Sequence, residues 1–191
     1  SVTMKGITTT SLLVAMVARQ TSSFAYVPHR HNTFSRSAVV LGMATPDKLP
    51  IMAEEAVMSQ KAHGTSEKPV MKDLRWDCDY STADRICNFN RHYAEYAGYW
   101  TTTSFLKYIK ERENPQEPIE FYDSVTGELL FTAPVGRSMQ DFLIESQSHG
   151  WPSFRDDEVN WDFVRCLKDG ECVSTTGTHL GHNIPDDSGN R

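Results

Sequence analysis

Gly150-Trp151-Pro152-Ser153-Phe154 and Thr178-His179-Leu180-Gly181-His182-Asn183 are the two stretches that decide how this sequence is read. Both lie where the residue pattern is typical of β structure. Residues 120–124 and 129–132 flank Thr126-Gly127, which predicts a hairpin. Residues 164–166 and 172–174 flank a short loop that ends in Gly170, which predicts a second, bulged hairpin. Between them, residues 138–146 have the cap and spacing of a short helix.

In this order, preceded by Leu129-Leu130-Phe131 and followed by Asp186, the two motifs resemble the methionine-R-sulfoxide reductase B family. The resemblance covers residues 119–191. It implies a mainly β fold in which two small antiparallel sheets pack together. It also implies an activity, the reduction of the R epimer of free or protein-bound methionine sulfoxide, which uses thiols and no cofactor.

The resemblance assigns a role to each matching residue. Trp151 would be the aromatic wall that holds the sulfur-methyl group, and Arg191 would flank the nucleophile. His179, His182 and Asp186 would form a polar network around the sulfoxide oxygen, which must be protonated to leave. These five residues are the candidate pocket.

The sequence departs from the family at the positions of its cysteines. In the family, the Arg that matches Arg191 is followed by an aromatic residue and the nucleophilic cysteine, so no catalytic residue can be assigned within residues 1–191. At the position where the family often has its resolving cysteine, this sequence has His149. The four zinc ligands match Asp123, Thr126, Val173 and Thr176, none of which is cysteine, so we expect no zinc. The chain as given is therefore predicted to be inactive as a reductase.

The remaining cysteines allow more than one interpretation. Cys166 and Cys172 would lie opposite each other across the second hairpin, where they could form a disulfide or remain thiols. For Cys78 and Cys87 we expect at least one simply buried side chain. A new metal site at His179 and His182 is a weaker explanation than the reductase pocket.

The first 43 residues are predicted to be a targeting presequence. They contain no Asp or Glu, and residues 12–18 form an apolar run too short to cross a bilayer. The junction at residues 22–28 resembles that of bipartite plastid presequences in diatoms and related algae. We therefore expect a plastid protein, in the stroma or on the stromal face of the thylakoid. An ordinary secreted protein is the alternative.

Two further segments separate the presequence from the β region. Residues 44–73 have no aromatic side chain and three prolines, which predicts an extended arm, ordered only on a partner, with a short helix at 52–61. Residues 74–118 are rich in aromatics and predict helix, with Asp84 as a cap. Their face, formed by Ile86, Phe89, Tyr93, Ala97 and Trp100, would pack in the core or bind another protein.

Charge and hydropathy exclude several partners. The net charge is −6, and all of the acidic residues follow the presequence, which argues against nucleic acid. No apolar run is long enough for a transmembrane helix. Two function classes remain: a plastid relative of the reductase, or a non-catalytic accessory subunit of a thylakoid complex, such as photosystem I or II of a diatom, that binds through residues 44–108.

Overall fold

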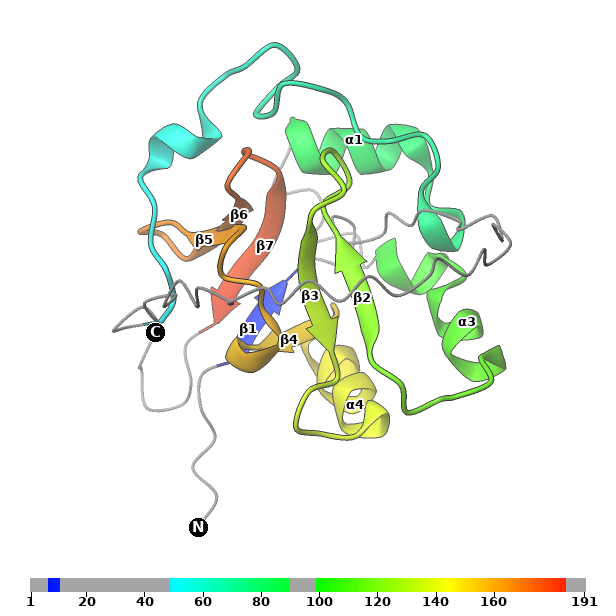
Figure 1. The fold of residues 1–191 in the computed structure, drawn as a ribbon. Helices are drawn as coiled ribbons and strands as arrows, with labels where there is room; N and C mark the ends of the chain where they lie inside the picture. Colours follow the sequence, from blue (N-terminus) through cyan, green and yellow to red (C-terminus); the bar gives the residue numbers. More distant parts are fainter. Residues whose placement is uncertain (1–6, 11–48, 90–98, 185–191) are drawn as a thin grey trace, which may run out of the picture.

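A computed structural model describes residues 7–10, 49–89 and 99–184. Within these residues the chain is 32% helix and 25% strand, and its strands form two small antiparallel sheets. The two expected sheets are therefore present. The expectation of a mainly β fold was too narrow, because helices on both sides of the first hairpin contribute as much backbone as the strands (Figure 1).

The larger sheet has five strands in the order β4-β1-β7-β6-β5. Their bounds are Ser153–Arg155 for β4, Ile7–Thr10 for β1, His179–Ile184 for β7, Glu171–Ser174 for β6 and Val164–Cys166 for β5. The smaller sheet is the hairpin of β2 (Ile119–Tyr122) and β3 (Leu129–Ala133). Both hairpins predicted from the sequence are confirmed, and Gly127 has the positive φ of 76° that its turn requires.

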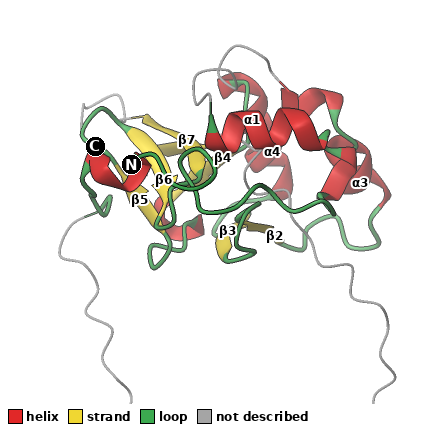
Figure 2. Cartoon of the chain, turned by 90° about the horizontal axis from the view of Figure 1, so that it is seen from above, coloured by secondary structure: helices red, strands yellow, loops and turns green. Residues whose placement is uncertain are grey.

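Within the described residues, three α-helices lie around the sheets. They are α1 (Tyr80–Asn88), α3 (Phe105–Glu111) and α4 (Met139–His149), with short 3-10 turns at Glu55–Met58, Arg75–Asp77, Tyr99–Thr102 and Asp156–Glu158. Seen from above, α1 and α3 lie toward one end of the molecule and β5 and β6 toward the other (Figure 2).

The N-terminal caps of two helices were predicted from the sequence, one correctly and one not. Helix α4 begins after Ser138, whose side chain forms a capping box with Asp141, as its sequence pattern predicts. Asp84 is not a cap, because α1 already begins after Asp79, whose carboxylate accepts the N–H of Thr82. Asp84 lies inside the helix and accepts hydrogen bonds from the Val70 N–H and from Asn88. Tyr93 and Ala97 of the predicted face lie outside the described residues.

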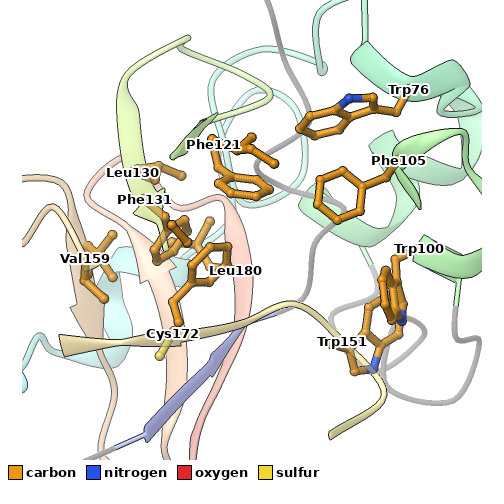
Figure 3. Close-up of a cluster of buried hydrophobic side chains, with 14 of the residues drawn as sticks. Trp76, Trp100, Phe105, Phe121, Leu130, Phe131, Trp151, Val159, Cys172 and Leu180 are labelled. Atoms are coloured by element: carbon orange, nitrogen blue, oxygen red, sulfur yellow. The ribbon is translucent and has the colours of Figure 1, made fainter. Parts of the chain in front are cut away.

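The core is a chain of aromatic rings between the two sheets and the helices (Figure 3). Phe131 of β3 and Phe154 of β4 stack with ring centroids 4.3 Å apart, and Phe121 meets Phe154 edge to face. Phe105 of α3 then joins Phe121 to Trp76. This continuous cluster fixes β4, which carries part of the first sequence motif, against the smaller sheet.

Residues 49–73 lie against the rest of the chain, in contrast to the expected arm. Ile51 and Ala53 exchange backbone hydrogen bonds of 2.9 Å with Cys166 of β5, and the N–H of Met71 donates to the Ser124 carbonyl. Val70 is buried. The predicted helix at 52–61 is only the 3-10 turn at Glu55–Met58. These contacts within the chain offset part of the cost of ordering the segment.

Strand β1 comes from the segment that was predicted to be a presequence. It pairs antiparallel with β4 on one side and with β7 on the other. The rest of the predicted presequence lies outside the described residues. In the described parts of the chain, we find no helix with both the length and the apolar character needed to cross a membrane.

Candidate functional site

The first motif begins where α4 ends. Gly150 adopts a left-handed conformation with φ of 82°, which stops the helix and turns the chain into β4. The carbonyl of Gly150 accepts a 2.6 Å hydrogen bond from the indole N–H of Trp100. Trp151 is buried, and Figure 3 shows its indole beside that of Trp100. Trp151, the residue expected to form the wall of the pocket, thus lies beside a second tryptophan that the sequence motif did not identify.

Ser153 anchors the same turn from the other side. Its backbone N–H donates to the Ser146 hydroxyl of α4 at 3.0 Å, and its own hydroxyl lies 2.9 Å from Nδ1 of His149. His149, at the position of the family's resolving cysteine, therefore contacts the strand that follows Trp151. These bonds hold β4 at a defined position relative to the helix.

The second motif contributes a buried histidine with a fixed ring. His179 begins β7 and is 1% exposed. Its Nδ1 lies 2.8 Å from Oε1 of Glu171, which is itself buried on the neighbouring strand β6. Within the described residues, Nε2 of His179 is buried and has no hydrogen-bond partner. One nitrogen of the ring is thus held in place by a carboxylate.

Glu171 is the site residue that the sequence analysis missed. It stands opposite His182 in the β6–β7 pairing, and an irregularity between Cys172 and Val173 lets it reach His179 as well. The rings of His179 and His182 have centroids 6.5 Å apart. A carboxylate at the start of the strand that pairs with the histidine strand is a signal that could have identified it, but the irregular pairing cannot be read from the sequence.

The two motifs flank the same strand. Thr9 of β1 pairs with Ser153 on one side and with His182 on the other. Their backbones are therefore separated by two strand spacings, about 10 Å. Asp186 and Arg191 lie outside the described residues, so the complete five-residue pocket stays a prediction.

The positions matched to the zinc ligands form a hydrogen-bond cluster centred on Asp123. Its carboxylate is 1% exposed and accepts the backbone N–H groups of Val125 and Thr126 at 2.7 and 3.2 Å. It also accepts the hydroxyl of Thr178 at 3.1 Å and that of Thr176 at 3.4 Å. The turn between β2 and β3 is thereby joined to the turn between β6 and β7. Three of the four matched positions meet here, whereas Val173 is not part of the cluster.

All four cysteines lie within the described residues, and all four are free thiols. Cys166 and Cys172 pair across the β5–β6 hairpin as predicted, and their sulfurs are 3.3 Å apart as two thiols rather than a disulfide. The hydrogen bond to Cys166, together with burial, raises the pKa of Cys172 well above its ordinary value. Cys87 is buried beside the hydroxyl of Ser124, and burial raises its pKa as well. The expectation that at least one of Cys78 and Cys87 is buried is therefore confirmed.

The described residues contain no group of three or more His, Cys, Asp or Glu side chains arranged to hold a metal ion. A scan against protein-family models found no match to the chain, and neither did searches of curated proteins and of solved structures.

Proposed function

We propose that this chain is a plastid protein related to the methionine-R-sulfoxide reductase B family, and that residues 1–191 contain binding motifs of that family but not its thiol chemistry. The observation that carries the proposal is the buried pair of Glu171 and His179, whose Nε2 is unpartnered among the described residues. His179 lies on β7, the strand whose histidines the resemblance places around the sulfoxide oxygen. The motif containing Trp151 leads into the same sheet, two strands away.

The geometry suits the recognition of a methyl sulfoxide. A sulfoxide has a strongly polar oxygen next to an apolar methyl group, so its site needs a polar group beside an aromatic wall. With Nδ1 directed at Glu171, Nε2 of His179 can donate to the sulfoxide oxygen when the ring is charged. The tryptophan pair supplies apolar surface next to the start of β4, two strands away from β7.

Turnover requires a thiolate that the described residues do not provide. The nucleophile must attack the sulfoxide sulfur, and only the deprotonated thiol does so efficiently. Cys172 is the cysteine nearest to His179 in the sequence, but its raised pKa keeps it protonated at neutral pH. Its side chain lies in the core with Leu180 and Phe131 (Figure 3).

An assay and a binding measurement test this proposal together. We expect the protein of residues 1–191 to form no methionine from N-acetylmethionine R-sulfoxide, with dithiothreitol or with thioredoxin as reductant. In calorimetry the same compound should bind, and the S epimer should bind at least tenfold more weakly. His179→Ala should remove binding, whereas His63→Ala, a control at a histidine bonded to Asp84, should leave it intact. Turnover that disappears in Cys172→Ser would contradict the proposal.

The proposed location rests on the presequence composition alone. An accessory role on a thylakoid complex is a separate prediction, and no contact of the described residues favours it, since residues 49–73 are bonded to their own chain. Native gels of fractionated plastids decide between the two. Co-migration with a photosystem would establish the subunit role, and a free monomer would leave the binding role.

A further inference from the structure

A pocket opens where α3 ends and β2 begins, and it contains none of the residues of the candidate site. Its volume is about 690 Å³. Its charged lining residues are Arg75, Arg112, Glu113, Glu117 and Glu120, and the ring of Tyr108 lies among them. Pro118 and Ile119 add a small apolar surface.

The two guanidinium groups are positioned around aromatic rings. The guanidinium carbon of Arg75 lies 4.4 Å from the ring centroid of Trp76 and 5.7 Å from that of Tyr108. The Arg112 guanidinium carbon lies 5.8 Å from the Tyr108 centroid. Arg75 also donates a 3.0 Å hydrogen bond to the carbonyl of Glu120. Such contacts restrict the orientation of each planar cation while leaving its remaining N–H groups for a ligand.

Arg112 has an unused donor in the interior. Its side chain is 8% exposed, and among the described residues its Nη1 atom is buried without a hydrogen-bond partner. Its Nη2 atom lies 3.6 Å from a carboxylate oxygen of Glu117, whose side chain is 65% exposed. A buried donor without an acceptor costs about 1–3 kcal/mol, and more when it is charged. A carboxylate matches this donor best, because guanidinium and carboxylate pair through two parallel hydrogen bonds.

The backbone beside Arg75 is strained. Trp76 and Asp77 have φ of 58° and 57°, in the left-handed region that bulky residues rarely adopt. The Trp76 carbonyl accepts a 2.9 Å hydrogen bond from the N–H of Ser104, which helps to hold this conformation. Strain of this kind persists where the surrounding structure enforces it, often at ligand sites. Here it fixes the turn that places Arg75 at the pocket.

The acidic residues determine the kind of ligand. Three glutamates face two arginines, so a simple anion would be attracted by the guanidinium groups and repelled by the carboxylates. Glu120 accepts a hydrogen bond from the hydroxyl of Tyr122, but Glu113 and Glu117 are exposed at the pocket. A ligand with both a carboxylate and an ammonium group satisfies both signs of charge.

We propose that this pocket binds the zwitterionic head of a small molecule, of which a free α-amino acid is the simplest case. Its carboxylate pairs with Arg112 and lies near Arg75, and its ammonium group faces Glu113 and Glu117. This inference does not depend on the proposed function, because it uses other residues and another surface.

Calorimetry with three probes tests the inference on the 191-residue protein. L-leucine carries both charges, N-acetyl-L-leucine only the carboxylate, and L-leucine methyl ester only the ammonium group. We expect L-leucine to bind and the two blocked probes to bind at least tenfold more weakly. No binding of L-leucine, or equal binding of N-acetyl-L-leucine, would overturn the proposal.

Two variants locate the binding. Arg112→Met should weaken L-leucine binding at least tenfold, whereas Lys110→Met, which removes a positive charge from the same last turn of α3 outside the pocket, should not change it. Glu117→Gln keeps the buried arginine and should weaken L-leucine but not N-acetyl-L-leucine, which separates recognition from misfolding. Wild-type affinity for L-leucine in Arg112→Met or in Glu117→Gln would refute the assignment.

Discussion

Asp123 joins two turns by hydrogen bonds at positions where the resemblance implies a zinc site. We expect Asp123→Ala to lower the free energy of unfolding by about 3 kcal/mol, because it leaves two backbone N–H groups and the Thr178 hydroxyl without their acceptor. Thr176→Val, which removes the 3.4 Å contact with Asp123 and the 2.9 Å hydrogen bond between the Thr176 and Ser174 hydroxyls, should cost less, about 1 kcal/mol. Urea denaturation of both variants measures the difference. Equal stabilities would show that the cluster does not hold the turns together.

Cys78 links stability to pH at the residue scale. Burial, and secondarily the Asp77 carboxylate, raises the pKa of Cys78 to about 12. Below the ordinary thiol pKa, folded and unfolded chains both keep the proton, so the stabilisation is complete. Between that value and 12 only the folded chain keeps it, so stability falls by about 1.4 kcal/mol per pH unit. Relative to wild type, Cys78→Ser should lack this part of the alkaline decline in denaturation curves, and an identical decline would contradict the assignment.

The residues of the candidate site differ in how far the sequence could predict them. Trp151 and His179 follow from short motifs that can be read directly. Glu171 and Trp100 do not, because one reaches the site through an irregular strand pairing and the other through a hydrogen bond to a residue far along the chain. A site built from non-local contacts shows only its local part in the sequence.

At the scale of elements, the β5–β6 hairpin holds a dithiol that can be oxidised. Cys166 and Cys172 are direct cross-strand partners with sulfurs 3.3 Å apart, and residues 51–53 cover Cys166. We expect diamide to form one intramolecular disulfide slowly, because both side chains are buried. The closed loop should add about 2 kcal/mol of stability. Mass spectrometry and thermal unfolding of a Cys78→Ser, Cys87→Ala variant check this, and a variant that stays reduced would disprove it.

Elements with local signals were predicted correctly, and elements ordered by distant contacts were not. The β2–β3 and β5–β6 hairpins follow from their turn residues, and α4 from the box at Ser138. The order of residues 49–73 depends on backbone bonds to β5 and to the Ser124 turn, for which no pattern within the segment is a signal. The prediction of Asp84 as a cap was wrong because α1 begins earlier, after Asp79, and the Asp84 carboxylate instead accepts the N–H of Val70.

At the scale of the whole molecule, the fold includes part of the N-terminal segment, whereas the proposed plastid location implies that this segment is removed. A plastid presequence is removed on import, yet Ile7–Thr10 fill the position between β4 and β7. Without β1, strands β4 and β7, which contain parts of the two sequence motifs, would each lose a hydrogen-bonded neighbour. Unpaired edges of this kind are costly when buried and reactive when exposed.

Removal of the first 43 residues should therefore loosen one defined part of the protein. In the chain of residues 44–191 we expect amide hydrogen exchange to accelerate at least tenfold in Ser153–Arg155 and His179–Ile184, because their bonds to β1 are gone. The β2–β3 hairpin, which does not contact β1 through backbone pairing, serves as the internal control and should exchange at the same rate in both chains. Exchange measured by mass spectrometry compares the two proteins peptide by peptide. Unchanged protection in β4 and β7 would mean that β1 does not stabilise the site, and that the presequence can leave without altering the fold.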